Sequence, residues 1–209
     1  MSEALLVSAA VEGIVDDAVV RRLLDNAGAE PDVVYIVGGK ANLRQRTRAY
    51  NLAAQHRPWL LLVDLNHEAD CAPALRALWL PRPSPFMVFR VAVREVESWL
   101  LADRQSMAEF LGVPITKVPQ APDQVDDPKR VVVDLARRST KRHIREDMVP
   151  RQGSGRSEGP AYATRMIEFT QRCWRPSVAA GRSESLHRCQ EALGRIVASH
   201  PTQSPRPIE

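Results

Sequence analysis

The stretch that decides the fold is WLLLVDL, residues 59–65, in which every residue except Asp64 is apolar. A strand with one face in water alternates apolar and polar residues, whereas a strand that is covered on both faces is apolar throughout. Residues 59–65 therefore predict a central strand of a parallel sheet, with a single carboxylate near its carboxyl end.

The sequence around this strand alternates between short apolar runs and stretches with helical periodicity. Further strands are predicted at residues 4–11, 32–37 and 86–93, and helices between them near 16–28, 41–55 and 71–80. Such alternation is typical of βαβ units. We predict an α/β fold in which a mainly parallel four-stranded sheet spans residues 4–93, with helices on both faces.

The alternation stops near Gly112, and the rest of the chain predicts loops and helices. Asp127 followed by Pro128, for example, has the form of a helix cap with proline in the first turn. We expect an α/β core at residues 1–112, a helical C-terminal region packed on it at 113–199, and a disordered tail at 200–209. A separate small domain after residue 112 is the alternative organisation.

Composition and charge indicate the class of protein. The 209 residues carry a net charge of +4, and the three cysteines are far apart in the sequence. This pattern indicates neither a disulfide framework nor a zinc ribbon. The first apolar stretch has no basic residues before it, so we interpret it as a strand rather than a signal peptide, and no apolar run has the length of a membrane span. We expect a cytoplasmic protein without membrane contact.

Acidic residues follow the predicted strands. Glu12 comes after the first strand, Asp64 closes the third, and others lie beyond the third and fourth: Glu68, Asp70, Glu95 and Glu97. The loops at the carboxyl ends of parallel strands form the crevice where ligands bind. In the common strand order 2-1-3-4, Glu12 and Asp64 face each other across that crevice. Clustered carboxylates repel unless a cation or a proton is shared, and hard oxygen ligands favour Mg²⁺ or Mn²⁺.

Several of these residues also have a structural interpretation. Asp70 precedes a predicted helix and is expected to cap it rather than to bind a ligand. Glu95 and Glu97 stand two apart at the start of a helix, so at most one is expected to point into the crevice. Glu12 taken alone could be a surface residue. Asp64 closes an apolar strand, where an unpartnered carboxylate is costly, and this position favours a function.

Basic residues form two groups that could contact phosphates. Gly38 and Gly39 precede Lys40 and could present backbone N–H groups to a phosphate, with Arg44 on the following helix. The stretch 129–145 is rich in lysine and arginine, and its candidates for nucleic-acid binding are Lys129, Arg138, Lys141 and Arg142. Both groups could equally be solvated faces. If they bind nucleic acid, the contacts are expected to be with its backbone.

Several stretches, taken together, carry a resemblance to a known family. They are VEGIVDDAVVRRLL, GGKANLRQR, WLLLVDLNHEADCAPAL, FRVAVREVESWLLAD, DDPK, GPAYATRMIEF and WRPSVAAGRSESL. The chain resembles a Toprim-like domain family of unknown function, which consists of small bacterial proteins often encoded beside AAA-type ATPases. The wider superfamily includes topoisomerases, primases and nucleases. The resemblance implies a Toprim fold, related to the Rossmann fold, over nearly the whole chain.

The resemblance also implies site residues. Glu12 takes the position of the Toprim glutamate, a general acid/base or metal ligand, and Asp64 that of the first aspartate in Asp-x-Asp. Asn66 replaces the second aspartate and, as a neutral ligand, is expected to lower the affinity for Mg²⁺. Asp70, Glu95 or Glu97 would then complete a Mg²⁺ or Mn²⁺ site.

The function implied by the resemblance is metal-dependent cleavage of DNA or RNA, with Glu12 and Asp64 as catalytic residues. An AAA-type ATPase is the implied partner, and the chain could be the effector of an ATPase-linked defence against phage. The alternative is a non-catalytic Toprim-like subunit that binds nucleic acid or the ATPase.

Overall fold

The computed structural model describes residues 4–199, and the tail predicted at 200–209 lies outside the described residues. Four strands form one sheet: β1 (Leu5–Val11), β2 (Ala29–Ile36), β3 (Trp59–Asp64) and β4 (Met87–Ala92). Every neighbouring pair is parallel, and the order is β2-β1-β3-β4. The predicted α/β fold and strand order are confirmed.

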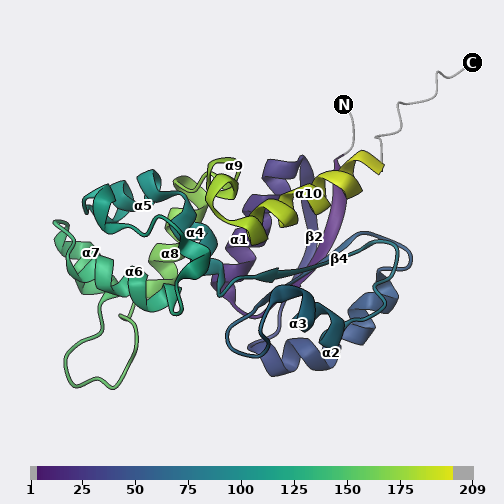
Figure 1. The fold of residues 1–209 in the computed structure, drawn as a ribbon, viewed down its shortest axis with the longest axis horizontal. Helices are drawn as coiled ribbons and strands as arrows, with labels where there is room; N and C mark the ends of the chain where they lie inside the picture. Colours follow the sequence, from purple (N-terminus) through teal and green to yellow (C-terminus); the bar gives the residue numbers. More distant parts are fainter. Residues whose placement is uncertain (1–3, 200–209) are drawn as a thin grey trace, which may run out of the picture.

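Helices cover both faces of the sheet (Figure 1). On one face lie α2 (Lys40–Ala53) and α3 (Ala72–Trp79), and on the other α1 (Ile14–Ala27) and α4 (Val96–Ala102). Alternate residues of β3 belong to different hydrophobic clusters: Leu60 and Leu62 pack with α1 and α4, whereas Leu61 and Val63 pack with α2 and α3. The uniform apolarity of β3 follows from this double burial.

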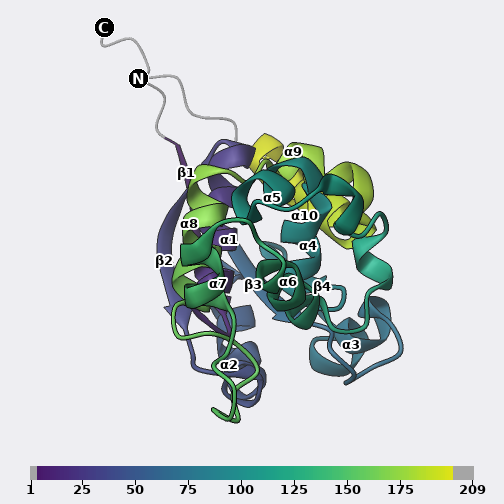
Figure 2. The same ribbon diagram turned by 90° about the vertical axis from the view of Figure 1, so that its left-hand side faces the viewer.

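The C-terminal region adds helices to the α1 face. They are α5 (Arg104–Leu111), α6 (Pro128–Arg137), α7 (Arg142–Met148), α8 (Tyr162–Arg172), α9 (Pro176–Ala179) and α10 (Glu184–Ser199), with short 3-10 helices at Ile115–Lys117, Pro122–Gln124 and Ala180–Arg182. Figures 1 and 2 show α8 beside α1. The buried Trp174 donates from Nε1 to the carbonyl oxygen of Trp99 at 3.1 Å. One hydrophobic cluster therefore joins the sheet to these helices.

Three boundaries differ from the sequence prediction. Strand β2 begins at Ala29 rather than at residue 32 and contains Pro31, which is tolerated because β2 is an edge strand. Helix α1 begins at Ile14 rather than near residue 16, with Gly13 as its N-cap and with the Asp16 side chain accepting from the Gly13 N–H. Helix α3 has Cys71 as its N-cap and no side-chain capping bond, so the prediction that Asp70 caps it is wrong.

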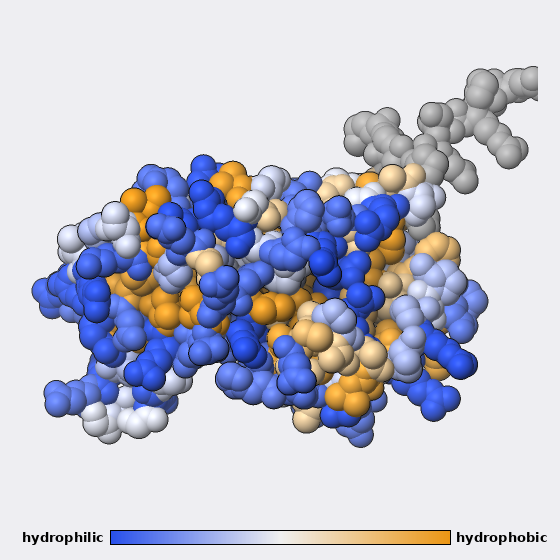
Figure 3. Space-filling view, in the orientation of Figure 1, coloured by the Kyte–Doolittle hydropathy of each residue, from blue (hydrophilic) through white to orange (hydrophobic). Residues whose placement is uncertain are grey.

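The side of the molecule seen in Figure 3 is mostly hydrophilic, with apolar patches between the charged groups. Figure 3 also shows a hollow between the part that contains α6 and α7 and the part formed by α2 and α3. Within residues 4–199 no helix is long and apolar enough to cross a membrane.

Candidate functional site

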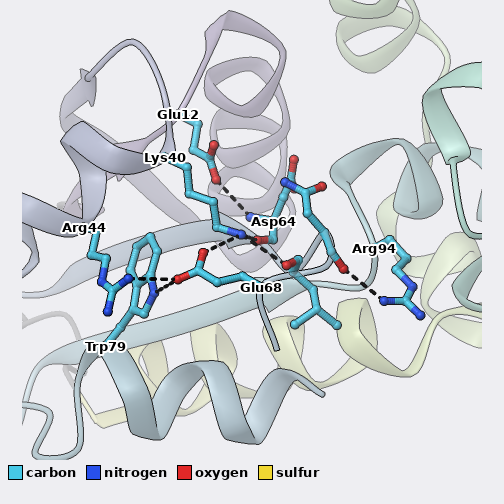
Figure 4. A network of polar contacts seen from close by, with 9 residues as sticks. Glu12, Lys40, Arg44, Asp64, Glu68, Trp79 and Arg94 are labelled. Carbon is cyan, nitrogen blue, oxygen red and sulfur yellow. Dashed lines mark hydrogen bonds and ion pairs between the residues drawn. The ribbon is translucent and has the colours of Figure 1, made fainter. Parts of the chain in front are cut away.

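Asp64 and Glu12 meet at the carboxyl end of the sheet. Asp64 is the last residue of β3, and its Oδ1 accepts a hydrogen bond from the Val96 N–H at 3.0 Å. Glu12 follows the neighbouring strand β1, and its Oε1 accepts from the Asp64 N–H at 3.3 Å. Figure 4 shows the Glu12 side chain directed at Asp64. The sheet topology thus brings together the two residues that the sequence singled out.

A pocket of about 200 Å³ opens beside Asp64, and we call it the acidic pocket. Its charged and polar lining residues are Asp16, Asp64, Glu97, Lys129, Glu158 and Tyr162. Asp16 accepts from the Gly13 N–H at 2.9 Å, and Glu97 accepts from the Tyr162 hydroxyl at 3.2 Å. The pocket therefore collects carboxylates from the start of α1, the end of β3, the start of α4 and the segment before α8.

Burial raises the pKa of three of these carboxylates, Asp16, Asp64 and Glu97. It raises the pKa of Asp16 to about 6 and that of Glu97 to about 7, and in both cases nearby negative charges act in the same direction. Burial also raises the pKa of Asp64 well above its ordinary value, and Asp16, Glu97 and Glu12 raise it further. The pKa of Glu12 is raised by burial as well, against the hydrogen bond from the Asp64 N–H. The pocket holds more negative charge than its surroundings stabilise.

Lys129 is the one basic residue among the described residues that line the acidic pocket. Its Nζ lies 3.8 Å from Oε1 of Glu97 and 3.6 Å from Oε2 of Glu158, and its N–H donates to Oε2 of Glu95 at 3.2 Å. Burial acts to lower the pKa of Lys129, but these three carboxylates outweigh it and raise the pKa. Lys129 therefore stays protonated and supplies a positive charge to the pocket.

Glu95 and Glu97 occupy different positions relative to the pocket. Glu95 is the N-cap of α4 with an extended backbone, and it lines a neighbouring groove, whereas Glu97 lines the acidic pocket with Asp64. Both contact Lys129. Because Glu95 is the N-cap and lies before the first helical turn, the rule for residues two apart on a helix does not apply to this pair. Only Glu97 lines the acidic pocket, but Glu95 lies close enough to contact the same lysine.

A second polar cluster, the Glu68 network, lies beside the Glu12 and Asp64 pair (Figure 4). The Glu68 carboxylate accepts from Trp79 Nε1 at 2.7 Å and pairs with Lys40 Nζ at 3.0 Å and with Arg44 Nη1 at 3.4 Å. Burial alone raises the pKa of Glu68, but the hydrogen bonds from Trp79 and Lys40 outweigh it and lower the pKa. The negative charge of Glu68 is therefore balanced by Lys40, Arg44 and the Trp79 N–H.

The Gly38, Gly39 and Lys40 segment already uses its polar groups within the protein. Gly38 and Gly39 have φ values of 72° and 113°, which favour glycine, and both N–H groups donate to the Glu12 carbonyl at 3.1 Å. Lys40 Nζ donates to the carbonyls of Asp64 at 2.7 Å and Leu65 at 3.1 Å. The segment therefore fixes the backbone of Glu12 and Asp64, whereas the sequence suggested a phosphate cradle.

Asn66 and Asp70 do not line the acidic pocket. Asn66 has a φ of 47°, a left-handed conformation that asparagine tolerates, and its carbonyl accepts from Nη1 of Arg94 at 3.0 Å. Asp70 is exposed and lines a different pocket with Asp123 and Arg188. The structure therefore places neither residue with Asp64 and Glu97.

The basic residues predicted to bind nucleic acid are dispersed. Lys129 belongs to the acidic pocket, and Lys141 Nζ donates to the carbonyls of Glu109 at 2.7 Å and Phe110 at 3.0 Å. Arg142 pairs with Glu146 at 2.7 Å, and Arg138 is exposed at the C-cap of α6. Lys141 therefore acts as a cap for the end of α5.

Sequence reasoning missed Asp16, Glu158 and Tyr162. The sequence places Asp16 only at the start of a predicted helix, although its spacing of three residues from Gly13 is the spacing at which a side chain reaches back to the N-cap N–H. Glu158 and Tyr162 come from the far end of the chain, and no local pattern indicates that they reach the sheet.

The described residues, 4–199, contain no group of three or more His, Cys, Asp or Glu side chains placed to hold a metal ion. In comparisons with known proteins, no protein-family model, no curated protein and no solved structure matches the chain.

Proposed function

We propose that the chain hydrolyses phosphodiester bonds in the acidic pocket with the help of a divalent cation. The observation that carries the proposal is a group of three carboxylates with raised pKa values, Asp16, Asp64 and Glu97, that line one pocket with Lys129 as its lysine, while Glu12 lies beside the pocket against Asp64. Buried carboxylates in such an arrangement need a proton or a cation. Perturbed acids clustered in a pocket are a typical signature of a functional site.

The donor set fits Mg²⁺ or Mn²⁺ by its chemistry, since carboxylate oxygens are the hard ligands that these ions prefer. Asp64, with Glu12 beside it, would hold the ion; since no three of the described His, Cys, Asp or Glu side chains are placed around a common point, these side chains would have to move toward the ion as it binds. A bound cation supplies charge stabilisation for a phosphate oxygen and lowers the pKa of a coordinated water.

The chain's own residues supply positioning and proton transfer. The Val96 N–H fixes the Asp64 carboxylate, and Glu12 accepts from the Asp64 backbone, so the two carboxylates are held in register by the sheet. Glu97 has a pKa of about 7 and can exchange a proton at neutral pH. The pKa of Tyr162 is raised by burial and by Glu97, so its hydroxyl stays protonated and donates to Glu97.

Lys129 can stabilise negative charge at the mouth of the same pocket. Its ammonium contacts Glu97 and Glu158 at 3.8 and 3.6 Å, distances that leave it free to shift toward a phosphate. An ammonium beside a phosphoryl group stabilises the charge that develops as the ester bond breaks.

The test is a cleavage assay on single- and double-stranded DNA and RNA with Mg²⁺ or Mn²⁺. Asp64→Asn and Glu12→Gln keep the shape of each side chain and remove its charge, and each is expected to lower the rate by at least about 100-fold. Asp25→Asn is the matched control, because Asp25 lies near the end of α1, away from the pocket, and pairs only with Arg22 in the described part of the chain. Its rate should equal that of the parent chain.

Calorimetric titration with Mn²⁺ provides a readout that does not depend on turnover. The parent is expected to bind the ion and Asp64→Asn to bind it more weakly. A parent chain that binds neither ion and cleaves none of these substrates would contradict the proposal. Binding of nucleic acid without cleavage would instead support the non-catalytic alternative.

The AAA-type ATPase partner and the role in phage defence remain hypotheses that rest on the family resemblance. Co-purification of the chain from its native host tests the partner directly. Recovery of an active chain with no ATPase would count against it.

A further inference from the structure

A groove of about 560 Å³ adjoins the acidic pocket, and we call it the arginine groove. Its charged lining residues are four basic ones, Lys129, Arg130, Arg137 and Arg156, and three acidic ones, Glu95, Asp127 and Asp134. Helix α6 contributes most of them, and the loop between α7 and α8 contributes Arg156. This loop extends below α6 and α7 in Figure 1.

The arginine groove is continuous with the acidic pocket. Lys129 lines both. Glu95 and Ser157 line the groove, and the residues that follow them in the chain, Val96 and Glu158, line the pocket. A chain-like ligand that lies in the groove can therefore reach into the pocket past Lys129.

The guanidinium groups of the groove are available to a ligand. Arg130 and Arg137 share one carboxylate, Asp134, at 3.9 and 3.2 Å, and their side chains are 78% and 58% exposed. A single carboxylate cannot neutralise two guanidinium groups. Arg156 forms no ion pair within residues 4–199. Exposed pairs of this kind are weak and exchange readily with phosphate.

The spacing of these groups suits an extended polyanion. Arg130 and Arg137 stand two helical turns apart on α6, about 10 Å along the helix axis, with Asp134 between them, so two exposed side chains that now turn toward Asp134 can instead each reach a different phosphate. Guanidinium groups bind phosphate in a forked geometry. The described lining contains no aromatic side chain on which a base could stack. The groove therefore has the chemistry for backbone contacts and lacks that for reading bases.

We propose that the arginine groove binds the phosphate backbone of a nucleic-acid strand and feeds that strand into the acidic pocket. This inference rests on the proposed function and identifies its substrate class as a polynucleotide. It also relocates the nucleic-acid contacts from Arg138, Lys141 and Arg142 to Arg130, Arg137 and Arg156.

The experiment measures binding of a fluorescein-labelled, mixed-sequence single-stranded oligodeoxynucleotide by anisotropy, in chelator, over a range of salt concentrations. The variant combines Arg130→Gln, Arg137→Gln and Arg156→Gln. Its affinity should fall by at least about tenfold at low salt, and the salt slope should fall by about two to three, on the order of one per phosphate contact.

The matched control combines Arg21→Gln, Arg172→Gln and Arg188→Gln. Each of these is an exposed arginine paired with a carboxylate one helical turn away, so the net charge changes equally. The control should bind with nearly the parent's affinity and slope. Equal losses in both triple variants, no loss in the groove variant, or no binding by the parent would overturn the inference. Thermal melting confirms that both variants are folded.

A small diester separates this inference from the proposed function. Bis(p-nitrophenyl) phosphate has a single phosphate and no chain to lie along the groove, so with Mn²⁺ the groove variant should cleave it at the parent's rate. If the parent cleaves neither this diester nor any of the nucleic acids, the proposed function fails while the binding result still decides the role of the groove. If the groove variant loses this activity, the arginines act in the pocket itself and the inference is overturned.

Discussion

Two carboxylate clusters share the carboxyl end of the sheet and differ in how their charge is compensated. In the Glu68 network one carboxylate meets Lys40, Arg44 and the Trp79 indole N–H, and its pKa lies below the ordinary value. In the acidic pocket Asp16, Asp64 and Glu97 lie around Lys129, and the pKa of each of the three is raised. The Glu68 network therefore stabilises the fold, whereas the acidic pocket is built at a cost in stability that a ligand can relieve.

Asp103 shows that burial alone does not make the difference. Its side chain is 1% exposed, yet it accepts from the Arg175 N–H at 3.0 Å and from the Arg175 guanidinium at 2.9 and 2.7 Å. These bonds, with one from Ser106, outweigh burial and lower the pKa of Asp103. A buried carboxylate is therefore structural where cations and N–H groups surround it, as at the start of α5, and unstable where carboxylates surround it.

The largest expected effect is the opposite response of Asp103 and Asp64 to the same substitution. Asp103→Asn removes the charge that pairs with Arg175 and weakens the hydrogen bonds that Asp103 accepts from Arg175 and Ser106, so it should lower the free energy of unfolding. Asp64→Asn removes a charge that the fold disfavours and keeps an oxygen for the Val96 N–H, so it should raise the free energy of unfolding at pH 8. Urea denaturation at pH 8 measures both.

Asp25→Asn again serves as the reference for a surface change, with an expected effect within about 0.5 kcal/mol. The comparison fails if Asp64→Asn destabilises the protein as Asp103→Asn does. In that case Asp64 has a stabilising partner, and its pKa is not raised in solution.

The next effect is an unusual dependence of stability on pH. The pKa of Glu97 is raised from 4.5 to about 7, so between these values the folded protein holds a proton that the unfolded chain has released. The free energy of unfolding should therefore fall as pH rises through this window, by about 3 kcal/mol from Glu97 alone. The cost is absent below pH 4.5 and complete above about pH 7. Denaturation at a series of pH values measures it.

Glu97→Gln isolates this contribution from that of Asp16, whose pKa is also raised, to about 6. The variant should be more stable than the parent at pH 8 and close to it at pH 4.5, with a flatter profile between. A parallel pair of profiles would show that Glu97 is ionised in the folded protein throughout the window.

The sequence was sufficient for the sheet and for the pair at its centre. The apolar run of β3 indicates a strand buried on both faces, and parallel topology then brings Glu12 and Asp64 together at the carboxyl end of the sheet. These are consequences of local patterns and of the general rules for parallel sheets.

The sequence was not sufficient for the partners of that pair. Lys129 was assigned to a basic helix face because its neighbours in the chain are basic, whereas in the fold it faces Glu97 and Glu158. Lys40 follows two glycines, as in a phosphate loop, yet its ammonium binds the carbonyls of Asp64 and Leu65. Both outcomes depend on contacts between segments distant in the sequence, and periodicity carries no information about such contacts.

The smallest expected effect tests the compensated cluster. Glu68→Gln removes the charge that Lys40 and Arg44 share, and it should lower the free energy of unfolding at pH 7 by roughly 1 kcal/mol, as for a partly exposed ion pair with one good hydrogen bond. Since the folded-state pKa of Glu68 is lowered, its contribution is present above its ordinary pKa of 4.5 and is lost as pH falls through the folded-state value. The free energies of unfolding of the parent and of Glu68→Gln should therefore converge in acid. The contribution of Glu97 has the opposite pH dependence, because its cost in stability appears as pH rises. Denaturation at pH 7 and at pH 3 measures the difference, and high salt should reduce it at pH 7. A difference that persists in acid would mean that the Glu68 side chain stabilises the fold by packing rather than by its charge.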